Sequence, residues 1–174
     1  MKCGKDITFW WLRTDSAEGG RAEAYHFVET RMNDEIIVKN ARFVKLKTIV
    51  DGIDGTIAVA ENFNHIPFEI KRAYYIYNLG NPKAVRGKHA HKKLEQVLFC
   101  ISGSCEIGLD DGENQQAILL DKPNIGIHLG IELWHTMKKF SPNCILLVLA
   151  SDVYDESDYI RSYDDFIDYI GKKK

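Results

Sequence analysis

Short apolar runs separated by turn residues fill the chain from about residue 41 to residue 150. The runs are Phe43–Leu46, Thr56–Ala60, Ala73–Tyr77, Val97–Ile101, Cys105–Leu109, Gln116–Leu120, Gly126–Leu129, Trp134–Met137 and Cys144–Leu149. Clusters typical of turns stand between them, such as Ser102-Gly103-Ser104 and Ser141-Pro142-Asn143. Many short strands at this spacing favour an all-β sandwich or barrel over alternating βαβ units.

A different pattern marks the C-terminal end. Apolar residues recur there at near-helical spacing, at Tyr159, Ile160, Tyr163, Phe166, Ile167 and Ile170. The acidic stretch Asp155–Asp158 precedes this stripe and Lys172–Lys174 follows it, which suits the two ends of a helix dipole. We predict a C-terminal helix packed on the outside of the barrel.

The N-terminal residues 1–40 lack a clear period. Ser16–Gly20 interrupts them like a linker, and Thr30–Glu35 is polar throughout. We predict two parts for the chain: an N-terminal appendage over residues 1–40 and one β domain over residues 41–174. The pair Trp10-Trp11 in the appendage is expected to serve packing.

Composition narrows the class of protein. The chain has 174 residues and a formal net charge of −2, so nothing general attracts it to nucleic acid or to an anionic membrane. No apolar segment is long enough to span a bilayer. The four cysteines stand apart, without metal-site or redox-motif spacing, and we expect reduced thiols in a cytoplasmic protein.

The segment Arg86–Glu95 carries the strongest chemical signal, because it contains His89, His91 and Glu95 just before the apolar run at Val97. On a β-strand His89 and His91 point to the same face, since side chains alternate with a period of two. Two neighbouring imidazoles can act as metal ligands or as a proton-transferring pair, because their ordinary pKa lies near neutrality. The spacing alone leaves both roles open.

The spacing His-x-His-x-x-x-Glu before a strand is the first half of the cupin metal-binding signature. In that interpretation His89, His91 and Glu95 are joined by His135 from a later strand. Such a ligand set suits zinc, iron or manganese and would make the chain a metal-dependent enzyme. A non-catalytic sugar-binding cupin, in which the histidines only hydrogen-bond a ligand, is a further alternative.

Longer motifs point to a narrower family. The segments Ile66–Ile76, Arg86–Leu98, Leu133–Met137 and Leu147–Tyr163 resemble the sugar 3,4-ketoisomerases that act on dTDP-4-keto-6-deoxyglucose. The resemblance runs from about residue 42 to 170 and leaves out the N-terminal appendage. It implies a cupin-like jelly roll, a homodimer, and tautomerisation of a dTDP-linked keto sugar without metal or other cofactor. It also implies a place before an aminotransferase that makes 3-amino sugars for polysaccharides or glycosylated metabolites.

The chemistry of this reaction assigns roles to the candidate residues. Moving a ketone from C4 to C3 needs a base for the C3 proton, a donor for the developing oxyanion and an acid for C4. We expect His89 and His91 to supply base and acid, with His89 favoured as the base. Glu95 is expected to orient a histidine or to close a local ion pair.

Other candidates would bind the substrate. Two phosphates favour guanidinium groups, which points first to Arg72 and Arg86 and less strongly to Lys71 and Lys92. Only one of Tyr74 and Tyr75 can face the cavity, since neighbours on a strand point to opposite sides; Tyr74 is the candidate chosen.

The expected configuration of the product rests on one residue and is weakened by another. By resemblance His135 borders the sugar, and histidine there is typical of relatives that give the galacto product. Those relatives usually read Arg-Gly where this chain has Asp54-Gly55. Asp54 therefore reverses a charge near the expected substrate contacts.

Overall fold

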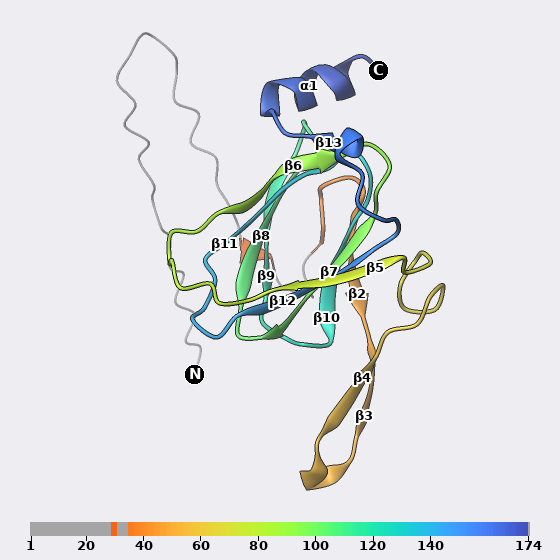
Figure 1. Ribbon diagram of the computed structural model, residues 1–174, viewed down its shortest axis with the longest axis vertical. Coiled ribbons are helices and arrows are strands. Elements are labelled where there is room, and N and C mark those ends of the chain that lie inside the picture. Colours follow the sequence, from red (N-terminus) through yellow and green to blue (C-terminus); the bar gives the residue numbers. More distant parts are fainter. Residues whose placement is uncertain (1–28, 31–34, 174) are drawn as a thin grey trace, which may run out of the picture.

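The computed structural model of the protein describes residues 29–30 and 35–173, which form two packed β-sheets and one helix (Figure 1). The six-stranded sheet has the order β1-β9-β8-β11-β6-β13, and the five-stranded sheet has the order β2-β10-β7-β12-β5. The first comprises β1 Glu29–Thr30, β6 Arg86–His91, β8 Cys105–Asp110, β9 Gln115–Leu120, β11 Trp134–Lys138 and β13 Tyr159–Ile160. The second comprises β2 Ala41–Lys45, β5 Arg72–Ile76, β7 Gln96–Ser102, β10 Ile125–Leu129 and β12 Ile145–Ala150. The predicted all-β jelly roll is confirmed.

The main core lies between the two sheets. Alternate residues of the central strands fill it, among them Leu98, Ile107, Ile127 and Leu146, none of which is exposed. The intervening residues of the five-stranded sheet point outward and form a second apolar cluster. In that cluster the loop before β5 covers the sheet, as Ile66 and Phe68 pack on Val97, Phe99 and Leu149.

The C-terminal helix is present but starts later than predicted. Helix α1 spans Tyr163–Gly171, and the side chain of Ser162 caps it by accepting a hydrogen bond from the backbone N–H of Asp165. Tyr159 and Ile160, which we expected in the helix, instead form β13 and pair with β6. The expectation was wrong because backbone pairing with an edge strand outweighs an apolar spacing that suits either structure.

The expected boundary at residue 41 does not coincide with an edge of the barrel. Strand β1 pairs with β9, and Val38 is 2% exposed in the main core. The side chain of Gln116 bonds the backbone of Ile37 and Glu35. The described residues before 41 therefore belong to the same packed body, whereas the Trp10-Trp11 pair lies outside the described residues.

A two-stranded hairpin projects from the barrel (Figure 1). Strand β3, Lys47–Val50, was not predicted; it pairs with β4, Thr56–Val59, through a turn that contains the 3-10 segment Gly52–Asp54. Every residue of β3 is exposed. Asp54 lies in the turn at the tip.

Among the described residues, no helix has the length and apolar character needed to cross a membrane.

Phe166 ties the helix to the sheet. It is fully buried against Ala90 and Ile160 on the outer side of β6 and β13. We expect Phe166→Ala to lower the unfolding free energy by about 3–5 kcal/mol, because it leaves a cavity under the helix. The neighbouring Ile167→Ala, at a position 37% exposed, should cost much less. Urea unfolding of both variants checks this, and equal losses would contradict the packing described.

Candidate active site

Three imidazoles meet on the inner face of the six-stranded sheet. His89 pairs directly with His135 across β6 and β11, and His91 pairs with Tyr159 across β6 and β13. Directly opposed residues share a face of the sheet. The ring centroids of His89 lie 4.9 Å from those of His91 and 4.5 Å from those of His135. Tyr159 completes the group, at 4.9 Å from His89 and 4.4 Å from His91.

An irregular turn of backbone aims His89 into this group. Gly87 and Lys88 both have positive φ, 76° and 58°, and the pairing of β6 with β11 shifts register beside them. A Cβ on Gly87 would lie 2.8 Å from the backbone oxygen of His135, so only glycine fits there. Such bulges re-aim side chains near active sites. This explains the glycine that precedes the histidines in the sequence.

Asp158 fixes the orientation of His91. Nδ1 of His91 donates to Oδ2 of Asp158 at 2.9 Å, since the carboxylate can only accept. Asp158 is itself held by the backbone N–H groups of Lys93 and Leu94, at 2.8 and 3.2 Å. With the hydrogen on Nδ1, the Nε2 atom of the neutral His91 ring is an acceptor.

Several polar atoms around this group are buried without a hydrogen-bond partner among the described residues. They are Nδ1 of His89, Nε2 of His91, Nε2 of His135, Nε of Arg72 and Oε1 of Gln96. Buried polar atoms in native proteins are almost always hydrogen-bonded. Their concentration in one region marks a site built to face the polar groups of a ligand.

Burial lowers the pKa of all three imidazoles. For His89, burial and the adjacent His91 lower the pKa to about 4. Burial also lowers the pKa of His91, although Asp158 opposes it, and holds the pKa of His135 well below its usual value. Near neutral pH all three rings are uncharged, and each has one nitrogen that can accept a proton.

Arg72 and Tyr74 approach the site from β5 in the opposite sheet. The guanidinium of Arg72 lies 5.4 Å from the Tyr74 ring and 5.8 Å from the Tyr154 ring. The hydroxyl of Tyr74 accepts a hydrogen bond from Gln96 at 3.0 Å. Tyr74 packs toward the main core, whereas Tyr75 is 63% exposed, so Tyr74 is the inward-facing member of the pair.

A charged and aromatic group borders Tyr159. The guanidinium of Arg161 lies 4.3 Å from the centre of the Tyr159 ring and forms two bonds of 2.7 Å to Glu156. The hydroxyl of Tyr154 also donates to Glu156. These bonds lower the pKa of Glu156 to about 2, so its charge persists at any working pH. Arg72, Asp158 and Tyr159 share a cavity of about 80 Å³ beside this group.

The other three predicted cations lie at the margin of the site. Arg86 is exposed at the start of β6, opposite Met137. The ammonium of Lys92 donates to the backbone oxygen of Ser157 at 2.7 Å, next to Asp158. Lys92 thus steadies the segment that carries Asp158, and Lys71 pairs with Asp152 at 3.4 Å.

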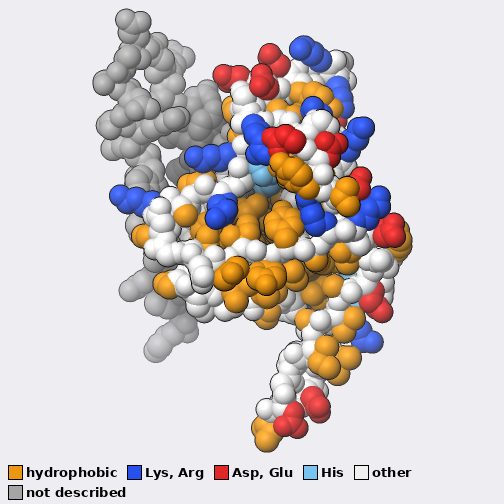
Figure 2. All heavy atoms as spheres, viewed as in Figure 1, with side chains coloured by type: hydrophobic (Ala, Val, Ile, Leu, Met, Phe, Trp, Pro, Cys, Tyr) orange, Lys and Arg blue, Asp and Glu red, His pale blue; other side chains and the backbone are white. Residues whose placement is uncertain are grey.

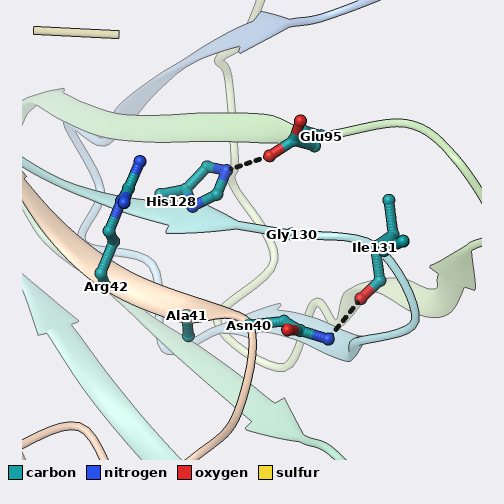
Figure 3. Close-up of a pocket in the computed structure, with 7 residues that line it drawn as sticks. All are labelled: Asn40, Ala41, Arg42, Glu95, His128, Gly130 and Ile131. Atoms are coloured by element: carbon teal, nitrogen blue, oxygen red, sulfur yellow. Dashed lines mark hydrogen bonds and ion pairs between the residues drawn. The ribbon is translucent and has the colours of Figure 1, made fainter. Parts of the chain in front are cut away.

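Glu95 does not join the histidine group. Its carboxylate bonds Nε2 of His128 at 2.8 Å (Figure 3). His128 lies between the core residues Ile127 and Leu129, so it points to the outer face of the five-stranded sheet. There Glu95 and His128 line a separate cavity of about 430 Å³. Glu95 therefore closes a local ion pair, as expected, but with His128 on the outer face and not beside His89 and His91, because the chain turns outward at the start of β7.

This arrangement also bears on the metal hypothesis. A zinc–nitrogen bond is about 2.0–2.1 Å, so ligand atoms on one ion lie close together. In the described part of the chain, no group of three or more metal-ligating side chains that includes a histidine has all its ligand atoms within 4.8 Å of one another. The proposed set His89, His91, Glu95 and His135 is not assembled by this structure.

Sequence reasoning missed three residues of the site. Asp158 and Tyr159 were interpreted as the acidic start and the apolar stripe of a helix, and Gln96 was not considered. All three lie within the matched segments Arg86–Leu98 and Leu147–Tyr163. That agreement was the available signal, but nothing local showed that Tyr159 would pair with His91.

Comparison with known proteins identifies the family. Residues 39–171 match the family FdtA, described as WxcM-like, C-terminal. The chain belongs to this family. The match covers both strands of the histidine group, Asp158 and helix α1.

Individual relatives agree with the family match. A TDP-4-oxo-6-deoxy-alpha-D-glucose-3,4-oxoisomerase of Aneurinibacillus thermoaerophilus is 51% identical over 75% of this chain and 93% of its own. The crystal structure of QdtA, a sugar 3,4-ketoisomerase of Thermoanaerobacterium thermosaccharolyticum in complex with TDP, is 42% identical. It covers 79% of this chain and 98% of its own, with a TM-score of 0.75. The TDP-quinovose 3,4-ketoisomerase WlaRB of Campylobacter jejuni is 49% identical over 75% and 99%, with a TM-score of 0.72.

The lowered pKa of His89 predicts acid sensitivity of the fold. The folded protein binds this proton only near pH 4, whereas the unfolded chain binds it near 6.5. Stability from His89 is therefore full above about pH 6.5 and is lost as the pH falls toward 4, by about 3 kcal/mol.

We expect urea unfolding between pH 7.5 and 4 to show a smaller loss of stability for His89→Asn than for the parent protein. Both proteins carry the same carboxylates, so the difference between their losses of stability reports the titration of residue 89. Parallel stability curves would contradict the assignment.

Proposed function

We propose that the protein is a nucleotide-sugar 3,4-ketoisomerase that converts dTDP-4-keto-6-deoxyglucose to a dTDP-3-keto-6-deoxyhexose. The observation that carries this proposal is the buried group His89, His91, His135 and Tyr159 on a family-matched framework. Relatives that share 42–51% of their residues bear the names of such enzymes. A His-to-Asn variant of QdtA has been crystallised with TDP-4-keto-6-deoxyglucose, which supports the same substrate class here.

In the proposed reaction His89 removes the proton from C3 of the sugar. The electrons form a C3–C4 enediolate, whose negative charge lies beside the imidazolium just made. That opposite charge raises the proton affinity of His89 from its low value in the empty site. A proton is then delivered to C4, the C3 hydroxyl gives up its proton and becomes the new ketone, and the C4 oxygen takes up a proton and becomes a hydroxyl, so no atoms are gained or lost.

His91 and Asp158 are proposed to act as a pair. Asp158 holds His91 in one tautomer, so that its Nε2 faces the substrate at a fixed angle. As an acceptor, Nε2 of His91 would take the proton of the C3 hydroxyl or relay a proton to C4. Burial of both groups supports this role, because electrostatic interactions are stronger where water is excluded.

Binding of the nucleotide is proposed to rely on Arg72 first. Its guanidinium is placed between Tyr74 and Tyr154, with Nε buried and unpartnered. A guanidinium matches a diphosphate through its planar donors. Arg86 would add charge from the exposed start of β6.

For the product we propose the galacto configuration at C4. His135 stands beside the proposed base His89, and this supports a role in directing the proton to one face of the enediolate. Asp54 lies at the tip of the projecting hairpin of its own chain. Trapping the product with a PLP-dependent aminotransferase and determining the C4 configuration by NMR tests this assignment.

We also propose the cytoplasm as the location and 3-amino sugar synthesis for polysaccharide or O-antigen as the pathway. The buried thiols of Cys100 and Cys144 are free although their sulfurs lie 3.6 Å apart, which suits a reducing compartment. A 3-keto sugar is the substrate that a sugar aminotransferase needs.

Incubation with dTDP-4-keto-6-deoxyglucose in deuterated buffer tests the activity. We expect a 3-keto product that carries deuterium, and a fall in kcat of at least about a hundredfold for His89→Ala. Glu95→Gln and chelator treatment should leave the rate within about threefold. A metal-dependent enzyme would instead lose activity in both, and a sugar-binding protein would bind the nucleotide sugar without exchange.

A second copy of the chain is the proposed partner of the β3–β4 hairpin. Isolated two-stranded hairpins are marginally stable in water, yet this one exposes an apolar series. Ile49, Val50, Ile53 and Ile57 are 47%, 71%, 103% and 59% exposed. Figure 2 shows hydrophobic side chains exposed along the projecting hairpin. A homodimer in which each hairpin packs on the partner would cover them.

We expect the protein to sediment as a dimer and the double variant Ile49→Lys/Ile57→Lys to shift toward monomer, because charged residues would be buried in the interface. Ile37→Lys, at a position 55% exposed outside the hairpin, is the matched control and should stay dimeric. A monomeric parent protein, or a dimer unaffected by the double variant, would contradict the proposal.

A further inference from the structure

Three cysteines far apart in the sequence meet inside the barrel. Cys100 lies on β7, Cys105 begins β8, and Cys144 directly precedes β12. Their sulfur atoms all lie within 4.8 Å of one another, and those of Cys100 and Cys144 are 3.6 Å apart. Each side chain is at most 2% exposed. The spacing of these cysteines in the sequence does not predict the cluster.

The tertiary fold creates the cluster at some distance from the histidine group. The tight turn at Gly103 joins β7 to β8, and β12 pairs with β7 along its length, with Leu146 opposite Cys100. Gln96 reaches the site from the start of the same strand. Cys100 lies four residues further on, about 13 Å along an extended strand.

The distances between the three sulfur atoms match those of a three-coordinate metal site, so the core would not have to expand to bind an ion. A metal–thiolate bond of about 2.3 Å in a trigonal plane corresponds to sulfurs about 4.0 Å apart. The observed separations, 3.6 Å for one pair and at most 4.8 Å for the others, are compatible with this value. An ion of this kind occupies the interstice between the sulfurs, so the packed neighbours need to shift little.

We propose that Cys100, Cys105 and Cys144 form a thiolate site for one copper(I) ion. Soft thiolate ligands select soft ions such as copper(I), and structural zinc sites are almost always four-coordinate. No fourth histidine, cysteine or carboxylate joins the three sulfurs in the described part of the chain. A monovalent ion also leaves less charge to neutralise in apolar surroundings.

Protons leave as the ion enters. Each thiol that binds as thiolate releases one proton to solvent, and the copper remains in its reduced state. The thiols of Cys105 and Cys144 stabilise the thiolate of Cys100 and lower its pKa to about 7. Burial raises the pKa of Cys144 to about 12.

The test is an anaerobic titration of the Cys3→Ser protein, in which these three are the only thiols. Copper(I) is supplied from its complex with bathocuproine disulfonate. We expect one ion per chain to transfer, and X-ray absorption to show sulfur as its only neighbours. Cys100→Ala should weaken the affinity at least tenfold, and circular dichroism verifies that this variant folds.

The X-ray absorption spectrum is measured on the protein that keeps all three cysteines, so this result does not depend on whether a variant folds. Failure to take copper from the competitor would overturn the proposal and leave the thiols as apolar packing. A nitrogen shell would also overturn it, because it would place the ion at the histidine group. Retention of the ion by the Cys100→Ala/Cys105→Ala/Cys144→Ala variant would also overturn the proposal, because the ion would then be bound elsewhere.

Discussion

The pairing of β6 with strands on both of its sides is the constraint on which the rest of the site depends. On one side β11 sets His135 opposite His89, and on the other β13 sets Tyr159 opposite His91. Backbone hydrogen bonds fix the register of these strands, and a slip of one residue would turn every side chain to the other face. The outward residues Ala90 and Ile160 are held down by Phe166 of helix α1. The helix thus stabilises the register that assembles the site.

Burial gives the histidine group its chemical character. Three imidazoles within one apolar enclosure keep one another uncharged, and the enclosure excludes water that would compete for their hydrogen bonds. Burying polar rings costs free energy. Asp158 offsets part of this cost, because it accepts a hydrogen bond from His91 and is itself held by two backbone N–H groups. The atoms left unpartnered face the same region. The site combines a fixed geometry with unused hydrogen-bonding capacity.

The two sheets contribute different residues to the site. The six-stranded sheet carries the histidines, whereas Arg72, Tyr74 and Gln96 come from the five-stranded sheet. The two faces of the five-stranded sheet also differ. Glu95 precedes Gln96 by one residue, yet it lies on the opposite face with His128. The alternation of a strand therefore separates a residue of the site from one outside it.

The sequence by itself determined most strands of the barrel, though not β1 and β13, together with the presence of a C-terminal helix and the candidate residues His89, His91 and His135. Strand periodicity and local motifs carry that information, because they depend on neighbours within a few residues. Only the tertiary structure decided that Asp158 and Tyr159 belong to the site, that Glu95 does not, and that three scattered cysteines meet. Those outcomes depend on which strands pair and in which register, and the pairing that brings Tyr159 to His91 joins residues 68 positions apart in the sequence. No local pattern encodes it.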